Sequence, residues 1–296
     1  MVKKILDKDK TEEKRFKMLL AVLAVIFLSV ATLYVLTIEK KDRGLVVKFF
    51  DVGQGDSILV QTPQNHNILI DGGPNNIAAD KINKSLPWWD WTIDLVILTH
   101  PHEDHVAGLI DVVDRYKVKR IMYTGVVHNS PAYLEWLKRI RDKKIPLVLI
   151  DRPQDIKLGD GCDMDILYPN RSFAGQTAKS VNNSSIVLLL NCEKKTVFLS
   201  GDIEKEVEEE LIRSKIELKA DVYKVSHHGS DTSSTNDLLK IMQPQYAIIS
   251  AGKDNQFDHP NQAVLNRLAN CSIITYRTDI DKDIIIEIKN GNIKKR

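Results

Sequence analysis

Cysteine is scarce in this sequence, and the spacing of the cysteines argues against a metal site built from thiolates. The 296 residues contain three cysteines, Cys162, Cys192 and Cys271, with no Cys-x-x-Cys pair. An odd number of cysteines without that spacing predicts neither a disulfide framework nor a thiolate zinc site. The cysteine count leaves the redox compartment of the protein open.

Charge of one sign is not in large excess. The chain carries 42 Lys and Arg against 40 Asp and Glu, a formal net charge of +2. Residues 1–38 hold seven of the basic and four of the acidic residues, so the remainder, with 35 basic and 36 acidic residues, is close to neutral. A neutral folded part lacks the broad positive field that nucleic-acid-binding proteins usually carry, although a local basic groove is compatible with it.

Long hydrophobic runs are absent except for one. With 43% hydrophobic and 28% charged residues, the composition excludes a wholly disordered chain and a polytopic membrane protein. Residues 18–38 form a single uncharged run without Gly or Pro, and as a helix they would span roughly 30 Å, the thickness of a bilayer core. The run predicts one transmembrane anchor.

The sequence around this run predicts its orientation and the domain organisation. Basic residues are more numerous before the run than after it, so we expect residues 1–17 in the cytoplasm and the body of the protein on the extracytoplasmic side of the cell membrane. Residues 39–43 are expected to be a linker and residues 44–296 one domain. A cleaved signal peptide is the alternative, because Ser29 and Ala31 offer a small-x-small site, but the apolar residues beyond it favour an uncleaved anchor.

Short β-rich runs alternate with amphipathic stretches after the anchor, without an internal repeat or a low-complexity linker. Strands are expected at residues 45–51, 57–62, 67–71, 94–99, 120–123, 146–150, 163–168, 185–190, 196–200, 221–226, 246–250, 272–276 and 284–288. Helices are expected at residues 105–116, 131–144, 204–213, 236–242 and 262–268. Two sheets covered by helices on their outer faces would bury this pattern, so the sequence predicts an α/β fold.

Six of the eight histidines lie in three clusters directly after predicted strands: His100, His102 and His105; His227 and His228; and His259. In the hexapeptide His-Pro-His-Glu-Asp-His, at 100–105, residues i and i+2 of an extended segment point the same way, so His100 and His102 can bind one divalent ion. Asp104 and His105, at the turn into the next helix, can face a second ion beside it. Imidazole nitrogens and carboxylate oxygens are zinc ligands, so the hexapeptide predicts a metal site. The alternative interpretation of the hexapeptide is a solvated polar loop without metal.

The hexapeptide resembles the His-x-His-x-Asp-His signature of the metallo-β-lactamase superfamily. Further motifs occur in the order found in the hydrolase domain of ComEC-type DNA-uptake proteins: Phe-Asp-Val-Gly-Gln-Gly-Asp-Ser at 50–57, Leu-Ile-Asp-Gly-Gly at 69–73, Ser-Gly-Asp at 200–202, Val-Ser-His-His-Gly-Ser at 225–230, His-Pro at 259–260 and Tyr-Arg-Thr-Asp at 276–279. The resemblance covers about residues 45–290. It implies a four-layer αββα sandwich that binds one or two metal ions at the edges of the sheets.

The resemblance also implies roles for individual residues. Asp202 resembles the carboxylate that bridges the two ions, and Asp71 resembles the acid that supports the metal loop without binding metal. His227 resembles a further ligand, and His228 beside it is expected to contact substrate, although which of the two binds metal is left open. His259 is expected to bind metal, to contact phosphate or to protonate the leaving group.

Other residues near these motifs are candidates for binding substrate. Lys224 and Ser230 are expected to contact phosphate oxygens, and Asn183 is a third candidate. Asn183 lies in the segment Asn-Asn-Ser-Ser, at 182–185, where the wider superfamily has another histidine ligand. The only histidine between the hexapeptide and this segment is His128, which is expected at the surface. Because the first metal site is one ligand short, the number of ions, one or two, is open, and manganese is an alternative to zinc.

A cluster of tryptophans precedes the hexapeptide. Trp88, Trp89 and Trp91 adjoin the predicted strand at 94–99. We expect these side chains to pack against that strand, with a loop that covers the active-site cleft as the alternative.

Together these observations predict a membrane-anchored metal-dependent phosphodiesterase that cleaves nucleic acid or another phosphodiester with metal-activated water. Asp104, Asp202 and His259 are its expected catalytic residues. Because the sequence contains one anchor in place of the multi-helix channel of ComEC-type proteins, it is not expected to move DNA across a membrane itself. An ester, lactone or lactam hydrolase is one alternative, and a non-catalytic binding subunit of a DNA-uptake or cell-envelope system is another.

Overall fold

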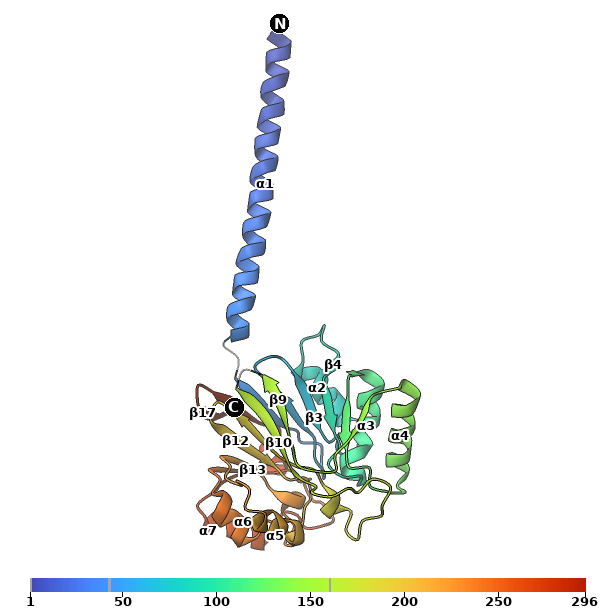
Figure 1. Cartoon of the computed structure of the whole chain (residues 1–296). Helices are drawn as coiled ribbons and strands as arrows, with labels where there is room; N and C mark the ends of the chain where they lie inside the picture. Colours follow the sequence, from blue (N-terminus) through green and yellow to red (C-terminus); the bar gives the residue numbers. More distant parts are fainter. Residues whose placement is uncertain (1, 42–43, 160) are drawn as a thin grey trace. The chain divides into compact units, whose positions relative to one another are not determined.

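The computed structural model describes residues 2–41, 44–159 and 161–296. The chain divides into two compact units, Met1–Arg43 and Gly44–Arg296. The first unit is one α-helix, α1 (Val2–Lys41; Figure 1). Within the described part of the chain, α1 contains the one segment, Lys14–Tyr34, that is long and apolar enough to cross a membrane, with a mean hydropathy of 2.4.

Helix α1 is longer than the expected anchor at 18–38. It also includes residues 2–17 and 39–41, which the sequence assigned to the basic N-terminus and to the linker. Lys, Arg and Glu are common in these flanking segments and are good helix formers, so the helix continues through them. Residue 1 and the linker residues 42–43 lie outside the described residues.

The second unit is built around two large sheets (Figure 1). The first sheet has the strand order β17 (Asn292–Lys295), β16 (Ile284–Lys289), β1 (Leu45–Phe49), β2 (Ile58–Gln61), β3 (Asn67–Ile70), β5 (Leu95–Ile97), β7 (Ile121–Tyr123) and β8 (Leu147–Leu149). The second has the order β15 (Ile274–Arg277), β14 (Tyr246–Ile249), β13 (Val222–Lys224), β12 (Lys195–Leu199), β11 (Val187–Cys192), β10 (Cys162–Tyr168) and β9 (Gln154–Gly159). A separate pair joins β4 (Thr92–Ile93) to β6 (Lys117–Val118).

Helices cover the outer faces of both sheets. The helices that follow strands of the first sheet are α2 (Ile77–Ser85), α3 (Glu103–Arg115) and α4 (Pro131–Lys143), and their buried residues form one apolar cluster with the outer face of that sheet. The helices α5 (Lys205–Arg213), α6 (Asn236–Met242) and α7 (Gln262–Asn270) form another cluster with the second sheet. The remaining short helices are η1 (Asn182–Ser184), η2 (Ser226–Gly229) and α8 (Thr278–Asp281). This arrangement confirms the four-layer αββα sandwich.

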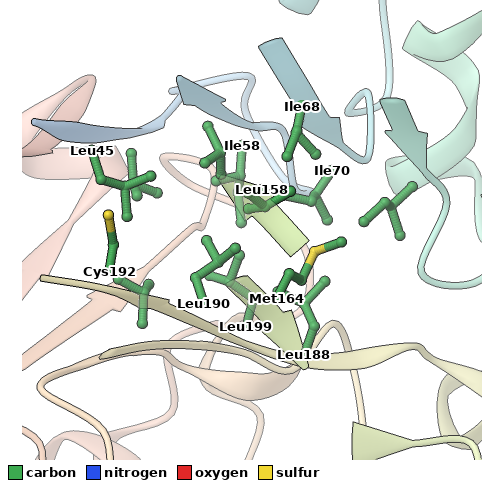
Figure 2. Packing of buried hydrophobic residues seen from close by; sticks show 14 of the residues in the cluster. Leu45, Ile58, Ile68, Ile70, Leu158, Met164, Leu188, Leu190, Cys192 and Leu199 are labelled. Atoms are coloured by element: carbon green, nitrogen blue, oxygen red, sulfur yellow. The ribbon is translucent and has the colours of Figure 1, made fainter. Parts of the chain in front are cut away.

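The largest apolar cluster lies between the two sheets (Figure 2). Leu45, Ile58 and Ile68 of the first sheet face Leu190 and Leu199 of the second. Alternate residues of β1 are buried, as the period-2 pattern of a strand with one face in the core requires. Burying each such side chain contributes about 1.5–3 kcal/mol, so this layer supplies much of the stability of the unit.

The sequence missed several elements. Helix α2 was not predicted, because it buries only Ala78, Ala79 and Ile82 and its apolar pattern is weak. The edge strands β9 and β17 were also missed, since their polar residues do not mark a buried face. Helix α3 begins at Glu103, two residues earlier than expected.

The expected packing of the tryptophan cluster is wrong. Trp88 and Trp89 are exposed, and Trp91 contacts the ring of Tyr116 at 5.7 Å between centroids while remaining about half exposed. The apolar contacts at this position come instead from Leu86, which is buried under the helices. The tryptophans do not line the cavity described below either.

One disulfide corrects the expectation drawn from the cysteine count. Cys162 of β10 and Cys192 of β11 are directly opposite each other in the antiparallel ladder and are bonded. Cys271 is exposed and free. An odd number of cysteines does not exclude a single pair, and the pair depends on a strand register that the spacing of 30 residues does not reveal.

This pairing predicts a thiol count. Protein denatured without reductant is expected to expose one reactive thiol, that of Cys271, and all three after reduction, as measured with a chromogenic thiol reagent. A Cys271→Ser variant serves as the control and should show none before reduction. Three reactive thiols in the unreduced wild type would contradict the disulfide.

Candidate metal centre

The candidate site residues follow the carboxyl ends of parallel strands in both sheets. β5 leads to the hexapeptide at 100–105, β12 to Asp202, β13 to His227 and His228, and β14 to the loop that contains His259. β5 lies parallel to β3 and β7, and β12, β13 and β14 are parallel neighbours. Because parallel strands end at the same edge of a sheet, the loops that follow them meet there.

Asp71, directly after β3, fixes the loop that follows β5. Its carboxylate accepts hydrogen bonds from the backbone N–H of Thr99 (2.8 Å) and from the Thr99 hydroxyl (2.7 Å). It also lies 2.8 Å from Nδ1 of His105. Since an ionised carboxylate only accepts, His105 Nδ1 donates its proton to Asp71, and Nε2 is directed towards Asp202. These contacts are those of a supporting residue, as the resemblance implied for Asp71.

The hexapeptide is extended in its first half and helical in its second. His102 is the N-cap of α3, with extended φ of −66° and ψ of 151°. Glu103 and Asp104 occupy the first turn, where the helix dipole stabilises negative charge. His105 follows in the same turn and is fully buried. The change of conformation at His102 separates the two pairs of candidate ligands.

Four side chains converge on one point. Nε2 of His105 is 3.1 Å from Oδ2 of Asp202 and 3.9 Å from Oδ2 of Asp104. Nε2 of His228 is 3.2 Å from the same oxygen of Asp202 and 3.2 Å from Oδ2 of Asp104. The four ligand atoms all lie within 4.8 Å of one another.

The chemistry of this group fits a divalent metal ion. Nε2 of His228 and Oδ1 of Asp202 are buried and form no hydrogen bond, so both atoms could bind an ion once the imidazole has lost its proton. Two imidazoles and two carboxylates are ligands that zinc accepts, and manganese accepts them as well. The residues present are therefore those that a divalent ion would need.

The charges of the group are strongly coupled. Burial disfavours a charged imidazole, but the carboxylates of Asp202 and Asp104 outweigh it and raise the pKa of His228 to about 10. Burial likewise disfavours an ionised Asp202, but His228 and His105 hold its pKa well below its usual value. The site thus favours positive charge between its carboxylates, and a bound cation would displace these protons.

His100 and His102 adjoin the same carboxylate. Nε2 of His100 is 3.1 Å from Nδ1 of His102 and 3.8 Å from Oδ2 of Asp202. Nδ1 of His100 is 3.2 Å from the hydroxyl of Ser185, which also accepts a hydrogen bond from the backbone N–H of Asp202. Ser185 therefore positions both ligands, which gives the segment at 182–185 a role although it lacks the additional histidine.

The converging groups open into a cavity of about 280 Å³. It is lined by Gln54, His102, Glu103, Asp104, Asp202, His227, His228, Phe257 and His259. Loops that follow strands of both sheets thus contribute to one cavity, and the candidate ligands Asp104, Asp202 and His228 are among its lining residues.

Residues 50–253 match the family model described as the metallo-beta-lactamase superfamily. The chain belongs to this superfamily. The match covers more than half of the chain and includes the hexapeptide, Asp202 and His228. The metallo-β-lactamase fold, with its metal-binding His and Asp cluster, is therefore that of this protein.

Two curated relatives match more than four fifths of this chain. ComE operon protein 3 of Bacillus subtilis (strain 168) is 32% identical over 268 residues, which cover 82% of this chain and 33% of that protein. Competence protein ComA of Neisseria gonorrhoeae is 28% identical over 252 residues, which cover 84% of this chain and 33% of that protein. The chain spans about a third of the length of these relatives.

A solved structure shares the fold. The metallo hydrolase Igni18 of the archaeon Ignicoccus hospitalis KIN4/I is 15% identical, with a TM-score of 0.53. The similarity covers 82% of this chain and all of that one.

The two adjacent histidines, between which the sequence left the metal ligand open, lie in different surroundings. His228, not His227, lies in the four-residue group, because both residues adopt left-handed φ values, 49° and 54°, instead of the alternation of a strand. Nδ1 of His228 is 2.9 Å from the carbonyl oxygen of Ser250, which accepts its proton and leaves Nε2 free. His227 lines the cavity outside this group, with Nε2 3.4 Å from the Asn182 amide nitrogen and Nδ1 3.8 Å from Glu204.

Lys224 does not line the cavity. Its side chain is fully buried, and its Nζ is 2.5 Å from Oδ2 of Asp56 and 3.8 Å from Oδ1 of Asp202. Burial alone would lower the pKa of Lys224, but these two carboxylates raise it, so the amine is charged. The expected contact with phosphate is therefore replaced by an ion pair beneath the metal ligands.

Ser230 and Asn183 also lie outside the cavity lining. The Ser230 hydroxyl is 3.0 Å from that of Thr232, within the loop after η2. Oδ1 of Asn183 accepts a hydrogen bond from the backbone N–H of Glu204, which precedes α5. Both residues therefore hold loops around the site rather than face it.

His259 does line the cavity, as expected. Burial, together with the neighbouring His227 and His228, lowers its pKa to about 4, so the imidazole is neutral near pH 7. Its Nδ1 is buried without a hydrogen-bond partner. A neutral ring suits a hydrogen bond to substrate better than transfer of a proton from an imidazolium.

Sequence reasoning missed other residues at the site. Gln54 lies in the lining, and its Oε1 accepts a hydrogen bond from the backbone N–H of Gly252. Phe257 stacks on His259 with 5.9 Å between ring centroids. His128, expected at the surface, has its ring 5.7 Å from that of His102. Only the motif around Gln54 carried a signal, since contacts between distant loops leave none in the sequence.

The position of His228 predicts a difference between two neighbouring variants. His228→Ala should lose the bound ion because it removes a ligand with a free Nε2, whereas His227→Ala should retain it. Metal content of the purified chain, measured by mass spectrometry, tests this, with the exposed His66→Ala as the control. Loss of metal in His227→Ala and retention in His228→Ala would contradict the assignment.

The buried ion pair predicts a loss of stability on substitution of Lys224. Lys224→Met leaves the carboxylate of Asp56 buried without its partner, which should lower the free energy of unfolding by about 3–5 kcal/mol. Adding Asp56→Asn should recover part of this loss, and the exposed Lys253→Met should change little. Denaturant titration measures all three, and a wild-type stability with a raised KM would instead indicate a phosphate contact.

Proposed function

We propose that this chain is a metal-dependent phosphodiesterase anchored in the cell membrane. In this proposal residues 1–17 are cytoplasmic, residues 18–38 span the bilayer and residues 39–43 link them to an extracytoplasmic hydrolase domain at 44–296. Membership of a superfamily of metallo-hydrolases supports the class of reaction. The substrate is a phosphodiester, and nucleic acid is the preferred candidate.

The position of Asp202 is the observation that carries this proposal. Its carboxylate lies within 3.8 Å of imidazole nitrogens from both halves of the hexapeptide, His100 and His105, and within 3.2 Å of His228. One carboxylate can therefore contribute to two neighbouring ion sites, one with His100 and His102 and one with the four-residue group. Paired ions suit phosphodiester hydrolysis because both the attacking and the leaving oxygen carry negative charge.

Each residue of the site has a role in this reaction. Divalent ions held by the cluster, zinc or alternatively manganese, would lower the pKa of water and stabilise negative charge on the phosphate. Asp71 and the carbonyl of Ser250 keep the Nδ1 protons of His105 and His228, so that each Nε2 faces the site. His259 would bind a phosphate oxygen through a hydrogen bond.

The relatives support nucleic acid as the substrate. One of the two curated relatives is named a competence protein and the other a ComE operon protein, and this chain matches a third of each at 28–32% identity. Competence is the uptake of DNA, so a hydrolase domain of this kind would meet DNA at the membrane. The disulfide supports an extracytoplasmic location, because such bonds persist in oxidising compartments.

The proposal predicts that Asp202→Asn abolishes hydrolysis. Activity on an activated phosphodiester should fall by several orders of magnitude because both ion sites lose a ligand, and chelation of metal should have the same effect until metal is restored. The matched control is Asp258→Asn, an exposed carboxylate in a left-handed conformation that asparagine tolerates.

Three outcomes would count against this function. Equal activity of the wild type and Asp202→Asn would remove the site assignment. Cleavage of lactams or esters, but of no phosphodiester, would favour the other class of hydrolase. Metal binding without any hydrolysis would favour a binding subunit.

A further inference from the structure

The loop between α2 and β4 presents tryptophan side chains to solvent. Trp88 is 80% exposed, Trp89 68% and Trp91 48%, whereas the fourth tryptophan, Trp136, is fully buried. Figure 1 shows this loop projecting beside β4 and α2. Single exposed apolar side chains are common on protein surfaces. Three tryptophans within four residues form an exposed apolar patch, which is typical of a surface that binds another protein or a membrane.

Hydrogen bonds hold this loop in shape. Nε1 of Trp91 donates to the carbonyl of Trp88 at 3.0 Å, and the backbone N–H of Asp90 donates to the carbonyl of Pro87 at 2.9 Å. The Asn67 side chain at the start of β3 donates to the Asp90 carboxylate at 3.1 Å. The tryptophans are thus displayed by an ordered turn that is bonded to the sheet.

The tryptophan turn lies at the end of the first sheet at which strand β1, the first strand of the second unit, begins. Val46 of β1 pairs with Gln61 of β2, Gln61 pairs with Asn67 of β3, and Ile68 pairs with Leu95 of β5. The start of β1 is therefore at the same edge as Asn67 and the tryptophan turn. Three inter-strand spacings of about 4.8 Å separate β1 from β5, so the start of β1 and the start of β5, which the turn precedes, lie about 14 Å apart across the sheet.

This edge is opposite to the metal centre. The hexapeptide follows the carboxyl end of β5, whereas the tryptophan turn precedes its amino end. From Leu95 to His100 an extended chain of five residues covers about 16 Å. A surface that bound the tryptophans would leave the cavity accessible.

The chain itself limits how far this edge can lie from the candidate membrane span. Residues 35–43 separate the apolar segment Lys14–Tyr34 from Gly44. The ten Cα–Cα steps from Tyr34 to Gly44 reach at most about 36 Å even when fully extended. A bilayer that held the apolar segment would therefore lie within reach of the tryptophan turn.

We propose that Trp88 and Trp89 insert into the headgroup region of the bilayer that α1 spans. This inference depends on the anchoring proposed above. Indole rings favour the membrane interface because they are apolar but carry an N–H donor. Exposed Lys84, directly before the turn, and Lys117, whose backbone N–H donates to the Trp91 carbonyl, would attract anionic lipid headgroups.

Tryptophan fluorescence of the full chain tests the proposal. All four tryptophans lie in the second unit, so α1 contributes no signal, and buried Trp136 is an internal reference. The chain is reconstituted in vesicles of phosphatidylcholine and phosphatidylglycerol, with or without bromine near the headgroup end of the phosphatidylcholine chains. Brominated lipid should quench the wild type, and Trp88→Ser/Trp89→Ser should lose most of that quenching.

Matched measurements separate the possible outcomes. Ile241→Ser removes an exposed apolar side chain on α6 and should be quenched like the wild type. A chain that floats with the vesicles but shows no quenching, or equal quenching in the double variant, overturns the inference and would favour a protein partner for the turn. A chain that fails to float with vesicles contradicts the anchoring instead.

Discussion

The carboxylate of Asp71 is the contact on which the metal centre depends. It joins the end of β3 to Thr99 and to His105, so the loop and the first turn of α3 have one position relative to the sheet. Helix α3 packs closely against the turn that follows Asp71. A Cβ on Gly108 of α3 would lie 1.9 Å from the carbonyl oxygen of Gly72 in that turn. Only glycine permits this close approach of α3. The resulting position of α3 places His105, in its first turn, within 3.1 Å of Asp202, which follows β12 of the second sheet.

Compensation of buried charge is the second constraint on the site. The metal ligands bring several carboxylates into a buried region, where unpaired charges are costly. Lys224 offsets part of this charge through Asp56 and Asp202, and the imidazoles of His105 and His228 offset more. The cost of isolated negative charge explains the cationic lysine below the candidate ligands, and it would also favour a divalent ion between them.

Sequence patterns predicted the parts of this structure that depend on local physics. The strand and helix alternation follows hydrophobic periodicity, and the hexapeptide at 100–105 contains its own change from extended to helical backbone. The sequence left open which of His227 and His228 joins the four-residue group, because the answer depends on left-handed φ values. The burial of Lys224 and the register that pairs the cysteines depend on contacts between distant strands, which no local pattern records.

The polarity of the first sheet separates two surfaces of the domain. Loops after the carboxyl ends of β3 and β5 carry Asp71 and the hexapeptide, and their conformation is fixed by buried hydrogen bonds. The connection before the amino end of β5 is held separately, by hydrogen bonds from the Asn67 side chain to Asp90 and Thr92, so it can carry an exposed turn without disturbing the ligands. Strand β5 joins the tryptophan turn at its amino end to the hexapeptide at its carboxyl end, so the orientation of the turn determines that of the metal centre. Any surface that binds the tryptophan turn therefore also sets the direction in which the cavity opens.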